Sequence, residues 1–286
     1  MWSFSRTAAE RSDRPLAVSN TPRKLLLNNR ADIFLLYLEE SMSKRLKGVL
    51  QYDGTGYRGW QRQADAQTVQ GVCEHSLEKI FGGHTSVVAS GRTDTGVHAR
   101  AQVVHFEHET TIGNPELKRA WNAQLPNDVW VERLTTASAD FHARHDAVAR
   151  TYRYFVADGR LAHSPFVCRY TWALDRRPDW DAISEATSSI VGAHDFRHFA
   201  KGVLEGQCSV YSAKWHRTRN GYALEITANR FLRHMVRALV GALVSIGRGQ
   251  IQPSSLSRAL QPHGEPVAAA HAPPQGLFLW RVKYAR

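Results

Sequence analysis

The feature that most constrains the fold of this chain is the way two kinds of hydrophobic spacing alternate along it. Residues 45–53 place apolar side chains at every second position, the spacing of a strand with one buried face. Residues 68–81 place them at the spacing of an amphipathic helix instead. Residues 209–217 and 222–228 flank Asn220-Gly221, a pair typical of a tight hairpin turn. Helices interleaved with antiparallel hairpins predict an α+β protein with helices on one face of its sheets.

The same two spacings divide the rest of the chain, and a second half begins near residue 160. Residues 263–275 are a loop rich in Pro, Ala and Gly. The first 43 residues fit neither spacing, and we expect them to be a disordered extension or the product of an upstream start codon. Strands are expected at 45–53, 86–91, 101–107, 128–135, 147–157, 209–217, 222–228 and 277–284, and helices at 68–81, 115–124, 178–191 and 230–247.

The charge of the chain lies in its body. The 286 residues carry a net charge of +11, of which the first 43 contribute only +1, so residues 44–286 carry +10. A basic body favours a polyanionic partner such as nucleic acid, because each phosphate that is neutralised releases condensed counterions. The alternative is a solvated basic surface that keeps the protein dispersed.

Cysteine and histidine spacing argues against a disulfide framework or a metal site. The three cysteines, Cys73, Cys168 and Cys208, are far apart, and neither a C-x-x-C pair nor an H-E-x-x-H motif occurs. Unpaired cysteines predict a reduced, cytoplasmic protein. No apolar stretch approaches the roughly 20 residues of a membrane span.

One polar loop between two expected strands stands out as a candidate site. Residues 91–99 read GRTDTGVHA, in which two glycines bracket an arginine, an aspartate and two hydroxyl residues. Glycine permits backbone angles that are closed to other residues, so such a loop can bend sharply and approach a ligand. An ordinary polar turn has the same composition. Spacing alone leaves both interpretations open.

The loop resembles the active-site motif of the TruA family of tRNA pseudouridine synthases, and further blocks in the same order resemble other motifs of that family. The departures are Thr95 where the family usually has Ala, Ala101 where it has Gly, and Ala238 where it often has Asn. Residues 1–43 have no counterpart. The matching blocks are YDGTGYRGWQRQ at 52–63, GRTDTGVHA at 91–99 followed by QVVHF, LP at 125–126 with DFHAR at 140–144, ARTYRY at 149–154, FLRHMVR at 231–237 and GLFL at 276–279.

This resemblance implies a fold, a substrate and a set of partners. The fold would be α+β: two α/β subdomains, residues 44–158 and 159–286, that share an extended, mainly antiparallel sheet with helices on one face and a central basic cleft. The activity would be isomerisation of uridine to pseudouridine at tRNA positions 38, 39 and 40 in the anticodon arm. The protein would be a cytoplasmic homodimer that binds tRNA, with no DNA or membrane partner, no cofactor and no metal.

The resemblance also assigns roles to four residues. Asp94 would be the nucleophile, a role that carboxylates also take in glycosidases. Tyr152 would stack on the flipped uracil and assist proton transfer, Arg237 would pair with Asp94, and Arg92 would contact RNA or hold the flipped nucleotide. Each has a plainer explanation from its position: Tyr152 as a core tyrosine sharing a face with Tyr154, Arg237 as a surface arginine at a helix start, and Arg92 as an ion-pair partner of Asp94.

His98 closes the motif and is expected to be structural. Two other classes of protein stay open from the sequence. One is a non-catalytic RNA-binding or tRNA-folding protein, which the presence of both Asp94 and Tyr152 disfavours. The other is a glycosidase-like hydrolase, which needs a second carboxylate. Asp53 and Glu107 are the nearest candidates for it, and neither lies in a comparable motif.

Overall fold

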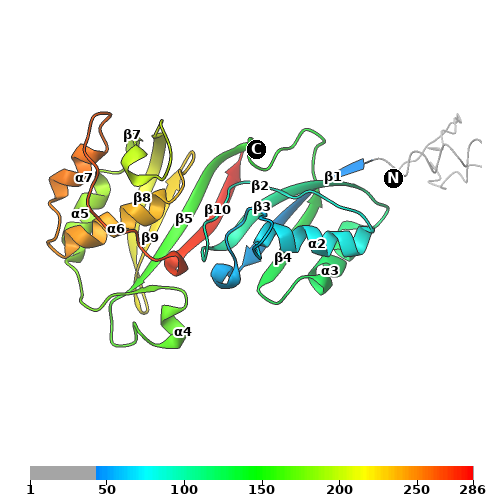
Figure 1. Cartoon of the computed structure of the whole chain (residues 1–286), viewed down its shortest axis with the longest axis horizontal. Helices are drawn as coiled ribbons and strands as arrows, with labels where there is room; N and C mark the ends of the chain where they lie inside the picture. The colour runs from blue at the N-terminus through cyan, green and yellow to red at the C-terminus, as the bar shows by residue number, and fades with distance from the viewer. Residues whose placement is uncertain (1–42, 286) are drawn as a thin grey trace, which may run out of the picture. The chain divides into compact units, whose positions relative to one another are not determined.

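The computed structural model describes residues 43–285, within which ten strands form one sheet (Figure 1). The strand order is β4-β1-β3-β10-β5-β9-β8-β7, with β2 beside β3 and β6 beside β5. All pairings are antiparallel except β10 with β3 and β5 with β6. The strands are β1 (Ser43–Tyr52), β2 (Val88–Ala89), β3 (His98–Glu109), β4 (Val129–Thr136), β5 (Ala147–Ala157), β6 (Trp172–Ala173), β7 (Gly192–Asp195), β8 (Gln207–Thr218), β9 (Gly221–Ala228) and β10 (Leu277–Tyr284).

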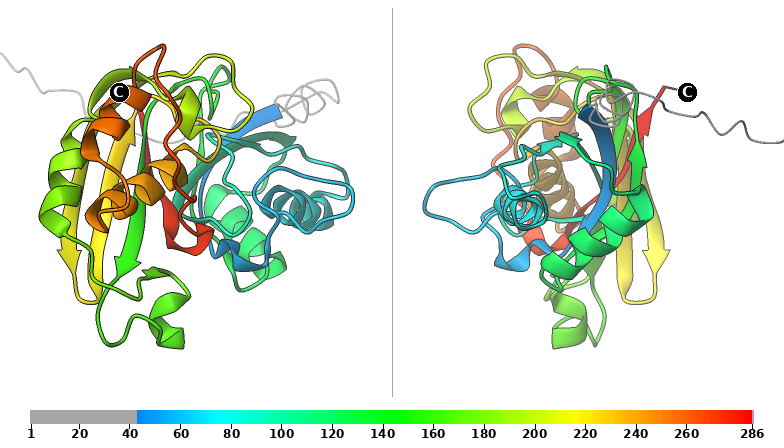
Figure 2. Two further views of the ribbon diagram at one scale, coloured as in Figure 1. Left: turned by 60° about the vertical axis from the view of Figure 1, so that its left-hand side comes forward. Right: turned by 90° about the vertical axis from the view of Figure 1, so that its right-hand side faces the viewer.

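The longer helices cover one face of this sheet. Figure 2 shows α2 and α6 on the same side of the strands. Helices α2 and α3 are joined by a hydrogen bond of 2.8 Å that Trp121 Nε1 donates to Ser76 Oγ. The expected α+β class, with a mainly antiparallel sheet and helices on one face, is confirmed. The helices are α2 (Val69–Phe81), α3 (Asn114–Gln124), α4 (Pro165–Cys168), α5 (Trp180–Ser188), α6 (Met235–Gly247) and α7 (Pro253–Ala259).

Local signals explain the elements of the first half. In β1 the buried positions alternate and include Leu46, Leu50 and Tyr52, so the expected face of this strand is confirmed. Helix α2 begins after Thr68, whose side chain accepts a hydrogen bond from the Gly71 amide. It ends at Gly82, which adopts the left-handed conformation with φ 75°.

Three expected element boundaries were wrong. The helix expected at 230–247 begins only at Met235, because His234 adopts a positive φ that a helix cannot accommodate. The helix expected at 178–191 ends at Ser188, and Gly192 begins β7. The strand expected at 86–91 is reduced to the two residues of β2. Elements β6, β7, α4 and α7 had not been predicted, because each is short and held by tertiary contacts.

Strand β10 joins the two halves of the sheet and brings their motifs together. It lies parallel to β3 and antiparallel to β5, so Leu279 pairs with Ala99 on one side and with Tyr152 on the other. Adjacent strands are about 4.8 Å apart, which places Tyr152 only two strands from the end of the GRTD loop. The C-terminal strand therefore assembles the candidate site from segments that are far apart in the chain.

The division into residues 44–158 and 159–286 stays a prediction. The predicted extension, residues 1–43, lies outside the described residues except for Ser43, where β1 begins. In the described part of the chain, no helix has both the length and the apolar character needed to cross a membrane.

Candidate active site

The GRTD loop, which carries this sequence at residues 91–94, connects β2 to β3. It is held in place by the YDGTGYRGWQRQ block at residues 52–63. The Trp60 amide donates to Thr93 O at 3.0 Å, and the Gly96 amide donates to Tyr57 O at 3.3 Å. Gly59 has φ 87°, and a Cβ atom there would lie 2.7 Å from Thr93 O. A side chain at position 59 would thus push the loop away. The two motifs, which are separate in the sequence, form one unit in the structure.

A network of buried polar side chains holds the GRTD loop in place. Tyr52 and Thr93 share a hydrogen bond of 2.8 Å between their hydroxyl groups. Gln102 donates to Gly91 O at 2.7 Å and accepts from Ser90 Oγ at 2.7 Å. These bonds are largely closed to solvent, which favours a single conformation of the loop.

Arg150 ties the same loop to three other segments without any carboxylate partner. Its guanidinium donates to the carbonyl oxygens of Ser90, Arg144, Ala147 and Asn229 at 2.7–3.1 Å. Burial lowers the pKa of this arginine. Arg150 therefore acts as a crosslink of the backbone and is not free to contact RNA.

Asp94 lies at the surface end of this unit and faces two basic side chains. Its Oδ2 atom is 3.9 Å from Arg237 Nη1 and 3.7 Å from His234 Nε2. Both separations exceed hydrogen-bond length, so the carboxylate keeps its capacity to accept or to attack. Arg237 is itself fixed, because its Nε donates to Ala272 O at 2.8 Å and its carbonyl oxygen accepts from the Ala272 amide at 2.9 Å.

His234 is a site residue to which the sequence analysis assigned no role. It is the one non-glycine residue with positive φ in the described part of the chain, at φ 68°. Such strain in a non-glycine residue is typical of functional sites. Burial lowers the pKa of His234, and nearby Arg237 adds to this effect, although Asp94 opposes it. Its position inside the FLRHMVR block was the only available signal, since backbone strain leaves no mark in a sequence.

Tyr152 is buried beside Asp94 with its hydroxyl group unengaged. Its ring meets Phe231 edge to face at a centroid distance of 5.0 Å. Burial, with the nearby charges of Tyr52 and Asp94, raises the pKa of its phenol. No hydrogen bond joins its hydroxyl group to residues 43–285. Five other tyrosine hydroxyls are hydrogen-bonded: those of Tyr52, Tyr57, Tyr154, Tyr170 and Tyr284.

Arg92 is not brought into contact with Asp94. Its side chain is exposed, and it forms no ion pair with any residue that the structure describes. The simpler expectation of an Arg92–Asp94 ion pair was therefore wrong. An exposed guanidinium two residues from the carboxylate remains available to a ligand.

His98 is fully buried and connects three segments. Its Nδ1 accepts from the Gly54 amide at 3.0 Å, and its Nε2 lies 3.2 Å from Gln275 O. Burial lowers the pKa of His98, which favours the neutral ring with its proton on Nε2. The 3.1 Å approach of Asp53 Oδ1 to Nδ1 is then a close contact and not an ion pair. These contacts fit a structural role.

Asp53 and Glu107, the two candidates for the second carboxylate of a glycosidase-like hydrolase, are both bound to other side chains. Burial acts to raise the pKa of Asp53, but hydrogen bonds from Thr55, Arg169 and Tyr170 outweigh it and hold the pKa low. Glu107 is paired with Arg45. Neither carboxylate is free to act as the acid–base partner that a glycosidase needs.

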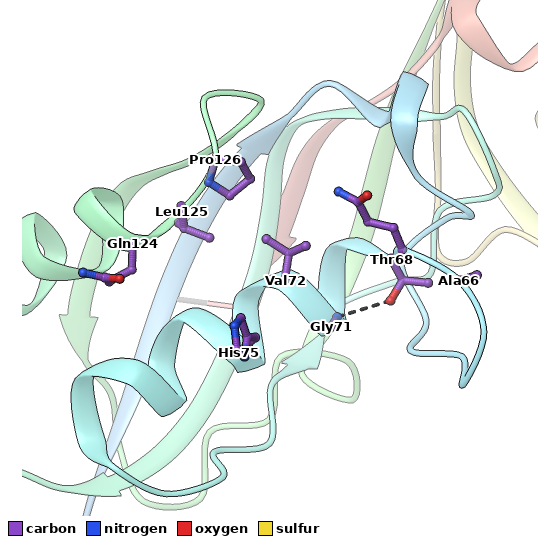
Figure 3. Close-up of a pocket in the computed structure, with 9 residues that line it drawn as sticks. Ala66, Thr68, Gly71, Val72, His75, Gln124, Leu125 and Pro126 are labelled. Atoms are coloured by element: carbon purple, nitrogen blue, oxygen red, sulfur yellow. Dashed lines mark hydrogen bonds between the residues drawn. The ribbon is translucent and has the colours of Figure 1, made fainter.

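A hollow of about 460 Å³ lies between the start of α2 and the end of α3 (Figure 3). Thr68, Val72, His75 and Leu125 are among its lining residues. It contains none of the four predicted site residues, so we place the site at the carboxylate and not at this hollow. Within residues 43–285, no cluster of three or more His, Cys, Asp or Glu side chains could hold a metal ion.

Comparison with known proteins identifies clear relatives. A family model described as tRNA pseudouridine synthase matches residues 49–146 and 186–285. The tRNA pseudouridine synthase A of Chlorobaculum tepidum is 38% identical over 248 residues, covering 85% of this chain and 99% of the relative. That of a Geobacillus species is 39% identical over 249 residues, with the same coverage.

Likeness to solved structures is much weaker. A chain of an H/ACA RNP bound to a substrate RNA containing 2′-deoxyuridine aligns with 70% of this chain and 44% of its own length. The identity is 11% and the TM-score 0.33, and a likeness this low supports no argument about function.

Proposed function

Because this chain belongs to the tRNA pseudouridine synthase family, and so is an isomerase that converts uridine in tRNA to pseudouridine, we propose that Asp94 is its nucleophile. We propose further that its targets are uridines 38, 39 and 40 of the anticodon arm. The observation that carries the proposal is that the Asp94 carboxylate and the Tyr152 hydroxyl, which forms no hydrogen bond to described residues, lie at the same site. Buried contacts of the neighbouring residues hold both side chains there.

The reaction explains why these groups are needed. The N1–C1′ bond breaks, C5 bonds to C1′ instead, and the proton on C5 is replaced by one on N1, so no electrons are gained or lost. A carboxylate can assist by attacking C1′ or C6, or by removing the C2′ proton. Each route requires a carboxylate that is ionised and not already hydrogen-bonded. Arg237 and His234 face the same oxygen of Asp94 without hydrogen-bonding it, so this oxygen can still contact the substrate.

Tyr152 is proposed to hold the uracil while it turns. Its ring offers an apolar surface for stacking. Because the pKa of its phenol is raised, the hydroxyl keeps its proton near neutral pH and enters the reaction as a hydrogen-bond donor. In Tyr154, on the same face of β5, the hydroxyl is already bound to Pro273 O. Tyr152 is therefore the better placed of the two for substrate.

The target base must leave the RNA stack to reach Asp94, which costs a few kcal/mol and least in loops. Arg92, exposed beside Asp94, is proposed to hold the flipped nucleotide through its phosphate or base. The protein is proposed to act in the cytoplasm as a homodimer, with one tRNA held in a basic cleft and reaching across both subunits.

The experiment uses an unmodified tRNA transcript with uridines at positions 38–40, incubated with the purified chain and no cofactor. Pseudouridine is mapped by carbodiimide labelling and primer extension. We expect primer extension to stop at these positions with the wild-type protein and not with Asp94→Ala. Stops elsewhere would overturn the proposed positions while leaving the nucleophile in place. Tight tRNA binding without stops would overturn the catalytic assignment of Asp94.

A further inference from the structure

A second hollow of about 370 Å³ lies at the tip of the β8–β9 hairpin, where it meets the chain that follows β5. Four arginines are among the residues that line it: Arg160, Arg177, Arg217 and Arg219. We call this hollow the arginine pocket. None of the four lies in the sequence blocks that resemble the TruA family, so the family motifs assign the pocket no role.

Most of the charge in the arginine pocket is not neutralised by the protein. The side chains of Arg160, Arg217 and Arg219 are exposed, and their guanidinium groups form no ion pair or hydrogen bond with any described residue. Arg177 reaches only to 3.7 Å from Asp158 Oδ2, the one carboxylate that lines the pocket. Other arginines of the described chain, such as Arg153 and Arg169, are paired with carboxylates.

The Asp158 carboxylate also binds a second partner besides Arg177. Its Oδ2 accepts a hydrogen bond of 2.7 Å from Trp180 Nε1. One carboxylate shared in this way cannot balance four guanidinium groups. Clustered like charges without partners destabilise a fold, so a cluster of this kind is expected where an anionic ligand neutralises it.

The frame that carries these arginines is rigid. A Cβ atom at Gly221 would lie 2.2 Å from Val156 O, so the hairpin turn packs directly on β5. The Asp158 amide donates to Asn220 O at 3.4 Å. The Tyr222 ring, which lines the pocket, stacks on Trp180 at a centroid distance of 3.9 Å. Arg217 and Arg219 are thus presented from fixed backbone, which reduces the entropy lost when they bind.

The arginine pocket lies within reach of the RNA that fills the active site. It begins at Asp158, the residue directly after β5 and six positions beyond Tyr152, and a strand rises about 3.3 Å per residue, so the two are about 20 Å apart. A nucleic-acid duplex carries a phosphate for about every 1.7 Å of its axis, so on the order of ten phosphates fall within that distance.

We propose that the arginine pocket binds backbone phosphates of the same tRNA whose uridine reaches Asp94. The ligand is a phosphodiester, because guanidinium groups form paired hydrogen bonds with phosphate oxygens. This proposal rests on the proposed function, since it takes the RNA to be positioned with its target base between Asp94 and Tyr152.

The test compares the wild type with Arg217→Gln/Arg219→Gln on the hairpin. A matched control, Arg119→Gln/Arg258→Gln, removes the same charge from arginines that contact only neighbours on or next to their own helices. The Kd for unmodified tRNA is measured from 50 to 200 mM salt. Turnover at saturating tRNA and Tm are measured for all three proteins.

The hairpin variant is expected to bind tRNA about tenfold more weakly near 100 mM salt. Its slope of log K against log salt should be flatter by about 1.4–1.8, the loss of two phosphate contacts. Turnover at saturation should stay within about twofold of wild type. The control should match the wild type in slope.

The proposal would be overturned if the hairpin variant and the wild type had equal slopes of log K against log salt. It would also be overturned if the hairpin variant and the control lost tRNA affinity equally. If the hairpin variant is unstable, Arg160→Gln replaces it, with an expected change of slope of about 0.7–0.9. Absence of pseudouridine with the wild type is a separate result that contradicts the proposed function alone.

Discussion

The Nε2 atom of His234 lies 3.7 Å from Oδ2 of Asp94, and His234 reaches this position from a left-handed backbone conformation with φ 68°. A glycine at 234 would adopt this backbone without strain, but it would leave no ring beside Asp94. His234 also stops the preceding apolar segment from joining α6. The same residue therefore sets the start of the helix and supplies a polar group to the candidate site.

His234→Gly is expected to raise stability and lower activity. Removing the left-handed strain should stabilise the fold by about 1 kcal/mol, or about 2–4 °C in Tm. Loss of the ring beside Asp94 should reduce kcat at least tenfold. Thermal melts and single-turnover assays measure the two effects. If activity falls only as far as stability falls, His234 has a structural role alone. His271→Ala is the control for local packing, because the His271 ring contacts that of His234.

Asp94→Asn is expected to abolish turnover while leaving the Kd for tRNA nearly unchanged. The amide has the shape of the carboxylate but cannot act as a nucleophile, and removal of a nucleophile typically costs a factor on the order of 10⁴ or more. Pseudouridine formation and tRNA binding are measured side by side, with exposed Asp65→Asn as the control. Substantial residual turnover by Asp94→Asn would refute the assignment.

Tyr152→Phe and Tyr154→Phe form a matched pair with opposite expected effects. Tyr152→Phe removes a hydroxyl that makes no bond to described residues, so Tm should hold while kcat falls by about 10²-fold or more. Tyr154→Phe breaks the bond to Pro273 O, so it should cost about 1 kcal/mol of stability and leave kcat near wild type. Full activity of Tyr152→Phe would exclude an essential hydroxyl.

Stability is expected to fall as the pH drops from about 6.5 to about 4. Burial, aided by nearby His142 and Arg45, lowers the pKa of His105 to about 4, and its Nδ1 accepts from the Ala143 amide at 3.1 Å. Between these two pKa values the unfolded chain binds a proton at this residue that the folded chain does not, so protonation favours unfolding. Denaturant melts at several pH values should show a smaller loss for His105→Asn. An identical pH dependence in the variant would contradict this.

Local chemistry was readable from the sequence. The alternation in β1 and the helical spacing of α2 each depend on residues a few positions apart, and each was predicted correctly. The polar loop that carries the GRTD sequence stood out from its composition, but only the resemblance to the TruA family made Asp94 and Tyr152 candidate site residues. The α+β class with helices on one face followed from helical segments interleaved with hairpins.

Contacts between distant residues decided the rest. Alternation places Tyr152 and Tyr154 on one face, but only the path of the chain near Pro273 determines which hydroxyl is occupied. The start of α6 could not be predicted, because the apolar spacing runs through His234 and the strain there is offset by packing elsewhere. Arg237 reaches Asp94, 143 positions earlier in the chain, because β10 pairs with both β3 and β5. Backbone preference acts over a few residues, whereas the position of a side chain at a site depends on packing contacts between segments that only folding brings together.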